Sequence, residues 1–149
     1  MRRAFFAVLV ALIPMLGTLK PATAQTVDDS IPALTSRAQK GNADAQNSLG
    51  LMYDNGQGVP QNHAEAVKWY RLAADQGDAR AQFNLGFVYA DGQGVPQSDV
   101  IAHMWYNLAG AQGVADALKY RDRLASTMTP AQIAEAQRLA AQWQRKGQP

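Results

Sequence analysis

Apolar residues recur at helical spacing on both sides of a glycine-rich stretch in the middle of the chain. Before the stretch, the i, i+4 and i+7 positions that line one helix face are Ala45, Leu49 and Met52. After it, apolar residues at helical spacing are Ala66, Trp69, Tyr70 and Ala73. The pattern predicts helix, loop, helix, and no stretch indicates a strand.

This helix–loop–helix pattern occurs twice. Residues 41–76 align with residues 77–112 without a gap, and 19 of the 36 positions are identical. A fixed period of this length is typical of a solenoid, in which each unit buries its apolar face against the next. The sequence therefore predicts two stacked units, each made of two helices.

Both ends of the array look modified. Residues 113–145 begin like a third unit but lack the glycine loop, so we expect a degenerate repeat and C-terminal cap. Within it, Thr129, Pro130 and Gln132 have the spacing of a capping box that starts a new helix. Residues 30–40 predict one lone helix that covers the first unit. The expected fold is all-α, with about seven helices.

The glycines of each loop are expected to stop one helix and reverse the chain. Gly56 and Gly92 predict a left-handed helix stop, and Gly58 and Gly94 a tight reversal. A phosphate-binding loop would follow a strand and end in Lys-Ser/Thr, whereas a helix precedes each loop here. The expected N-caps of the helices that follow are Asn62 and Ser98.

Small and aromatic residues recur at matching positions inside the predicted helices. Gly50 and Gly86 each cost ~1 kcal/mol of helix propensity relative to alanine, which indicates that a close helix contact offsets the loss. The recurring aromatic residues of the second helices are Trp69, Tyr70, Trp105 and Tyr106. Their invariant repeat position favours a core role over a sugar-stacking platform.

Three motifs in each unit carry a family resemblance. They are "A-x-A-Q-x-x-L-G-x-x-Y" in the first helix, "G-x-G-V-P-Q" in the loop and "A-x-x-W-Y-x-x-A" in the second helix. Residues 41–112 closely resemble the Sel-1-like repeat family, relatives of the tetratricopeptide repeats, and residues 113–144 are similar to the C-terminal unit of bacterial members. The resemblance implies a right-handed α-solenoid that usually acts as a non-catalytic scaffold.

The resemblance also implies narrower roles. Some exported members of the family bind cell-wall material or modulate signalling at the envelope. Disulfide-stapled members have been linked to β-lactam binding, but this chain has no cysteine, so that branch is a poor guide. The absence of cysteine also excludes thiol nucleophiles and cysteine-ligated metal sites.

The N-terminus has the composition of a secretory signal. Arg2 and Arg3 precede an apolar run over 4–16, which is too short to cross a bilayer of ~30 Å. Small residues at 22–24 then match a cleavage site. The expected segments are a signal peptide over 1–24, cleaved after Ala24, and a flexible N-terminus over 25–29. We expect a periplasmic or secreted bacterial protein with no integral membrane segment after cleavage.

Removing the signal changes the charge balance. Arg2, Arg3 and Lys20 leave with it, so the mature chain has 11 Lys and Arg against 12 Asp and Glu, a net charge of −1. No dense cluster of Lys and Arg remains, and we expect no nucleic-acid partner.

Catalytic patterns are missing. His63 and His103 occupy different positions in their repeats, so stacking does not bring them together, and we expect both on the solvated surface. The chain has no HExxH or S-x-x-K motif. We therefore expect no catalytic residues, no metal site and no cofactor.

The positions that differ between units point to a binding surface. On the first helices they follow i, i+3, i+4, i+7 spacing, a single stripe opposite the shared face. The stripe positions are Asp44, Asn47, Ser48 and Leu51 in the first unit, Arg80, Phe83, Asn84 and Phe87 in the second, and Asp116, Lys119, Tyr120 and Arg123 in the third. Stacking should place these stripes side by side on one concave surface.

Phe83 and Phe87 have two interpretations. They either fill core or form an apolar anchor, flanked by Arg80, Lys119 and Arg123, for a peptide with aliphatic and acidic groups. The predicted partner-binding residues are Asn47, Leu51, Arg80, Phe83, Asn84, Phe87, Lys119, Tyr120 and Arg123.

Three functional classes remain, in order of preference. The first is an exported, non-catalytic, monomeric scaffold that binds a protein or peptide segment on the concave face of its repeats. The alternative is an envelope protein that binds peptidoglycan or another glycan. The third is a cell-wall or β-lactam hydrolase, for which no nucleophile–base pair is visible.

Overall fold

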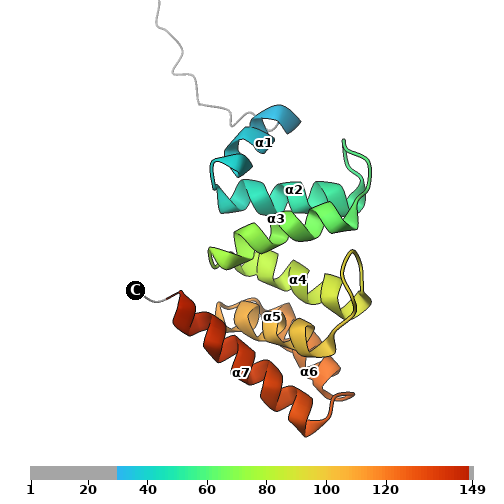
Figure 1. Cartoon of the computed structure of the whole chain (residues 1–149), viewed down its shortest axis with the longest axis vertical. Coiled ribbons are helices and arrows are strands. Elements are labelled where there is room, and N and C mark those ends of the chain that lie inside the picture. The colour runs from blue at the N-terminus through green and yellow to red at the C-terminus, as the bar shows by residue number, and fades with distance from the viewer. Residues whose placement is uncertain (1–29, 148–149) are drawn as a thin grey trace, which may run out of the picture.

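The computed structural model describes residues 30–147, which form seven helices and no strand. The helices are α1 (Ile31–Gln39), α2 (Ala43–Asn55), α3 (His63–Asp75), α4 (Ala79–Asp91), α5 (Asp99–Ala111), α6 (Ala115–Ala125) and α7 (Pro130–Lys146). Along the longest axis, α1 to α6 follow one another in chain order (Figure 1). The prediction of an all-α solenoid is confirmed. The predicted signal peptide over 1–24 and N-terminal segment over 25–29 lie outside the described residues.

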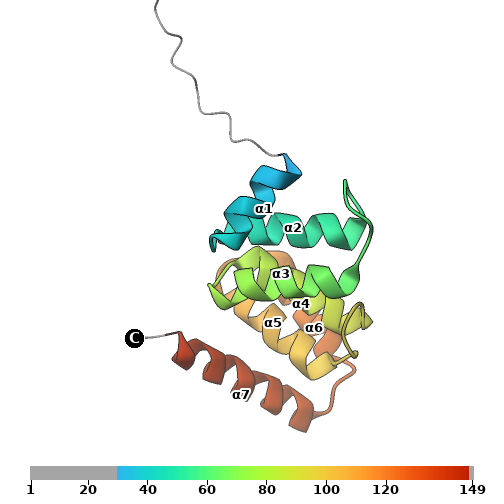
Figure 2. The same ribbon diagram turned by 45° about the horizontal axis from the view of Figure 1, so that its top comes forward.

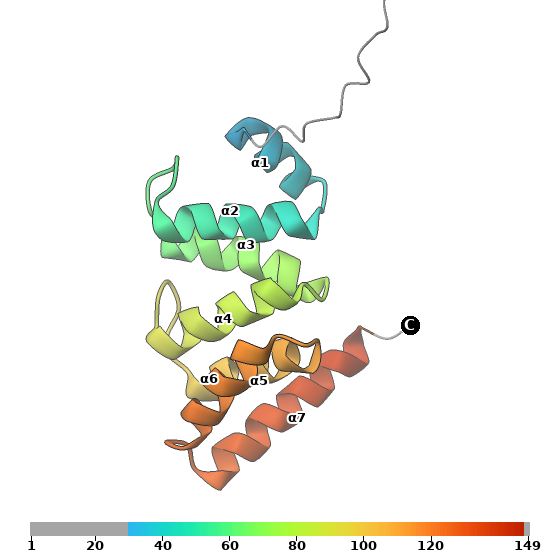
Figure 3. The same cartoon turned by 180° about the vertical axis from the view of Figure 1, so that it is seen from behind.

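The helices form two hairpins, to which the terminal helices are added. Helices α2 and α3 pack closely, as do α4 and α5, and α3–α4 and α5–α6 contacts join successive units. Helix α1 packs on α2, and α7 packs on α5 (Figures 1 and 3). None of the helices within residues 30–147 combines the length and the apolar character that crossing a bilayer requires.

The predicted helix boundaries are confirmed by their hydrogen bonds. The Asn62 side chain accepts from the Glu65 amide, and the Ser98 hydroxyl accepts from the Ile101 amide. At the C-terminal end of α4, the backbone of Gly92 is left-handed with φ 69°, a conformation that residues with a side chain rarely adopt. Two residues later, a Cβ on Gly94 would lie 2.5 Å from the His63 carbonyl carbon, so this loop packs tightly on the start of α3.

Mid-helix glycines allow tyrosine rings to pack directly on a helix backbone. A Cβ on Gly50 would lie 2.5 Å from the Tyr70 ring, and one on Gly86 would lie 2.3 Å from the Tyr106 ring. Both rings are buried. The close helix contact expected from the sequence is therefore confirmed, and it occurs within each hairpin.

Replacing Gly86 by alanine is expected to lower the free energy of unfolding by about 1–3 kcal/mol, because the new methyl would overlap a locked ring. The gain of ~1 kcal/mol in helix propensity does not offset this overlap. Gly110→Ala is the matched control: its methyl would meet the Leu118 side chain, which is 37% exposed and free to move outward. Urea denaturation of both variants measures the difference, and equal losses would contradict the role of the ring.

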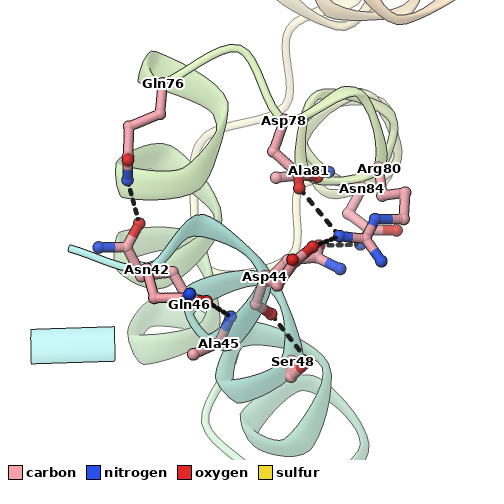
Figure 4. A network of polar contacts seen from close by, with 11 residues as sticks. Asn42, Asp44, Ala45, Gln46, Ser48, Gln76, Asp78, Arg80, Ala81 and Asn84 are labelled. Atoms are coloured by element: carbon pink, nitrogen blue, oxygen red, sulfur yellow. Dashed lines mark hydrogen bonds and ion pairs between the residues drawn. The ribbon is translucent and has the colours of Figure 1, made fainter. Parts of the chain in front are cut away.

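A glutamine relay joins each unit to its neighbour. Gln46 donates from Nε2 to the Ala38 carbonyl, 3.0 Å away, and accepts from Gln76 Nε2 at 2.7 Å (Figure 4). Gln82 repeats both bonds one unit later, to the Ala74 carbonyl and from Gln112. Since Gln46 and Gln82 are buried, the relay satisfies amide groups that would otherwise be costly to bury.

The third unit replaces this relay with an apolar contact. Leu118 stands at the position of Gln46 and Gln82, and its side chain lies over Gly110. Gly110 in turn stands where the earlier units have Ala38 and Ala74. The glycine leaves room for the branched side chain, so the two changes belong together.

Helix α7 covers the outer face of α5. It starts with the predicted capping box, in which the Thr129 amide donates to Gln132 Oε1 at 2.8 Å. Trp143 meets Trp105 with ring centroids 6.0 Å apart, edge to face. The buried residues of α5 include Met104, Trp105 and Leu108.

The equivalent face of α3 is more exposed. Its residues at the matching positions are Lys68, Trp69 and Leu72. Leu72 is 50% exposed, whereas Leu108 is 2% exposed. This difference, together with the Trp105–Trp143 contact, indicates that α7 rather than the repeat itself buries this face of α5 (Figure 2 shows α7 beside α5).

Candidate functional site

The first helices of the units adjoin through the stripe positions. Arg80 of α4 pairs with Asp44 of α2 (Figure 4). Asn84 Nδ2 of α4 donates to Asn47 Oδ1 of α2 at 3.0 Å. We call the surface formed by the stripe residues of α2, α4 and α6 the stripe face. The structure thus brings the stripes of the first two units side by side.

Between the second and third units the same contact is aromatic. Phe83 and Phe87 of α4 lie 5.7 and 4.6 Å, centroid to centroid, from Tyr120 of α6. Tyr106 of α5 stacks on Tyr120 at 5.8 Å with an interplanar angle of 27°. We call Phe83, Phe87, Tyr106 and Tyr120 the aromatic cluster. Phe83–Tyr120 takes the place that Asn47–Asn84 holds one unit earlier.

Part of the predicted surface is therefore contact between units. Asn47 is only 4% exposed, so its predicted contact with a partner is wrong: its amide oxygen is bonded to Asn84 inside the stack. Phe83 and Phe87 are half-buried and pack against the main core, so they combine both interpretations left open by the sequence. The physical reason is that stacking turns the middle of each stripe toward the next helix.

The exposed remainder contains both neutralised and free charges. Arg80 forms ion pairs with Asp44 and Asp78. Lys119 Nζ lies 3.0 Å from Asp116 Oδ1. Arg123 has its guanidinium 5.8 Å from the centre of the Tyr120 ring. Within residues 30–147 it makes no ion pair. The stripe face also exposes Leu51 and Tyr120, at 39% and 36%.

A pocket of about 290 Å³ opens between the C-terminal halves of α4 and α6. We call it the α4–α6 pocket; its lining residues are Phe87, Ala90, Asp91, Tyr106, Tyr120, Arg123, Leu124 and Thr127. A second hollow of about 220 Å³ lies along α6 and shares Tyr120 and Arg123 with it. Three members of the aromatic cluster therefore line a cavity that is open to solvent.

The neutral state of the Tyr106 phenol suits hydrogen bonding to a ligand better than nucleophilic catalysis. Burial raises the pKa of Tyr106, and the negative charges of Asp91 and of ionised Tyr120 act in the same direction. The phenol therefore stays neutral at physiological pH. A neutral phenol can donate a hydrogen bond but is a poor nucleophile.

Several pocket residues were not expected from the sequence. Tyr106 was assigned to the core, and its ring is indeed buried while it also lines the pocket. Asp91, Leu124 and Thr127 lie beyond the stripe and carried no mark in the repeat alignment. They are neighbours only because the C-terminal end of α6 lies beside the C-terminal end of α4.

The two histidines differ in their surroundings. His63 Nδ1 lies 2.7 Å from Asp54 Oδ1, and its side chain is 36% exposed. The expectation of a surface position is wrong for His103, which is 3% exposed. The repeat alignment contained the signal, because His103 stands at the position of Val67, which is also buried. Burial lowers the pKa of His103, and the charge of Arg121 adds to the effect.

In residues 30–147, His, Asp and Glu do not gather in threes or more in a way that could hold a metal ion. The His63–Asp54 pair joins the start of α3 to the end of α2.

The sequence matches a family model for the Sel1 repeat at residues 43–78 and 79–114. These two segments have the same 36-residue period as the units expected at 41–76 and 77–112, shifted by two residues. No curated protein matches the chain.

Two solved structures are similar to this chain. One is a protective antigen of uropathogenic Escherichia coli with an SLR fold, 31% identical over 77% of this chain, with a TM-score of 0.75. The other is a Sel1 repeat protein from Oxalobacter formigenes, 41% identical over 62% of this chain, with a TM-score of 0.58. This chain spans 25% of the first and 40% of the second. The two matched segments identify residues 43–114 as two consecutive Sel1 repeats.

Proposed function

We propose that this protein is an exported, non-catalytic scaffold that binds a segment of another protein on its stripe face. The observation that carries the proposal is the α4–α6 pocket, in which an open aromatic floor is held by the stacking of two units. Pockets lined by aromatic side chains with a few polar groups at the rim are typical anchors for a partner's apolar side chain.

Export is the second part of the proposal. It rests on the positive start, short apolar run and small-residue cleavage pattern of residues 1–24. Cell fractionation with an antibody against the mature chain would measure the location directly. A chain that stays at full length in the cytoplasm would contradict export without affecting the binding proposal.

The binding experiment uses a photoreactive residue in place of Tyr120 in living cells. We expect a discrete protein adduct, because Tyr120 is 36% exposed and lines the pocket. The matched control places the same residue at Leu72, which is 50% exposed on α3 and outside the pocket. Mass spectrometry of adducts from both positions identifies what each site contacts.

A loss-of-function variant completes the test. Arg123→Gln alters only an exposed side chain, so it should weaken capture while circular dichroism stays unchanged. Serine at both Phe83 and Phe87 is less informative, since these rings also pack against the core. Equal adducts at positions 120 and 72 would contradict the proposal. Retention of the protein on purified sacculi, with no protein adduct, would favour the glycan-binding alternative.

A further inference from the structure

The α4–α6 pocket carries opposite charges on its two walls. Asp91 comes from the end of α4 and Arg123 from α6, and both side chains line the same cavity. Both residues are exposed, and neither makes an ion pair with any residue in the range 30–147. The apolar floor between them consists of Phe87, Tyr106 and Tyr120.

Other charges on the stripe face are already neutralised. Arg80 is held by Asp44 and Asp78, and Lys119 by Asp116. An incoming segment would have to compete with these pairs to use them, whereas Asp91 and Arg123 are available at once. Selection by charge should therefore be concentrated at the two walls of the pocket.

We propose that the pocket binds a peptide segment in which a large apolar side chain is flanked by one acidic and one basic residue. The apolar side chain occupies the aromatic floor, the acid pairs with Arg123 and the base pairs with Asp91. A segment with the same charge on both flanks would be attracted by one wall of the pocket and repelled by the other. This specificity rests on the proposed function, since it describes a partner for the same face.

The test uses three capped pentapeptides and the purified mature chain. Their sequences are Gly-Glu-Phe-Lys-Gly, the reversed Gly-Lys-Phe-Glu-Gly and the neutral Gly-Gln-Phe-Gln-Gly, each acetylated and amidated. Nuclear magnetic resonance titration follows the backbone amides of Phe87, Tyr120 and Leu124. One of the two charged peptides is expected to bind about fivefold more tightly than the neutral one at low salt, as exposed ion pairs allow.

Two wall variants and one control locate the effect. Arg123→Gln and Asp91→Asn should each remove part of the advantage of the charged peptide, and added salt should reduce it further. Lys68→Gln on α3, outside the pocket lining, should leave the advantage unchanged.

The outcomes separate the two proposals. If the neutral peptide moves the same resonances with equal affinity, charge selection is wrong and peptide binding at this pocket stands. If neither wall variant changes the preference between peptides, the assignment to Asp91 and Arg123 is wrong. If no peptide moves a pocket resonance while Tyr120 crosslinks still form in cells, the specificity falls but the scaffold function stands.

Discussion

Ending the chain after Met128 is expected to produce a protein that self-associates and melts at a lower temperature. The truncation removes α7 and uncovers Met104, Trp105 and Leu108, which are 9%, 6% and 2% exposed in the complete stack. The burial of these side chains contributes a large share of the free energy of unfolding, which is only about 5–15 kcal/mol for a small domain. Light scattering after size exclusion, with thermal circular dichroism, measures both effects.

A substitution in the truncated chain serves as the control. Met104→Lys gives the uncovered face of α5 the lysine that α3 has at Lys68. This change should reduce association without restoring the melting temperature, because it removes apolar surface but adds no packing. A truncated chain that remains monomeric with an unaltered melting curve would contradict the role of α7 as a cover.

Replacing Trp105 by alanine is expected to lower the free energy of unfolding by about 3–5 kcal/mol. The indole is 6% exposed and lies edge to face against Trp143, so its removal leaves a cavity between α5 and α7. Urea denaturation, followed by circular dichroism so that the lost fluorophore does not interfere, measures the change.

Trp69→Ala is the matched control at the same repeat position. Trp69 is half-buried against a smaller cluster that includes Leu34 and Leu49, and α7 packs mainly on α5. Its replacement should cost less than that of Trp105. Equal losses would show that the repeat position alone, without the C-terminal cover, determines the contribution of the tryptophan.

Most of the fold follows from local chemistry that repeats along the chain. The helix starts at Asn62 and Ser98 and the glycine stop at Gly92 depend on neighbours within a few residues, so the sequence predicted them correctly. The close approach at Gly50 and Gly86 was predictable for a related reason. A glycine that weakens a helix twice at the same position indicates a constraint from packing.

The candidate site was less predictable because it depends on which side chains meet between units. Alignment showed that Asn47 and Phe83 differ, but not that both turn toward the next helix. His103 was misplaced because histidine is commonly exposed, although its equivalent Val67 is apolar. The pocket could not be predicted, because it depends on how the ends of α4 and α6 lie relative to each other. The periodicity within a single helix carries no information about this.

The ring contacts with Tyr120 make the two units non-interchangeable. A permuted chain with residues 41–76 directly before α6 would present Ala74 to Leu118, whose exposed side chain would have to move outward. The same permutation would set Asn47 against Tyr120 and dismantle the ring contacts. An added copy of residues 77–112 keeps both contacts where it meets α6, but between the two copies Gly110 would face Gln82 and Phe83 would face Asn84. Lengthening by duplication therefore requires a copy of the second unit last before α6 and new contacts between the copies.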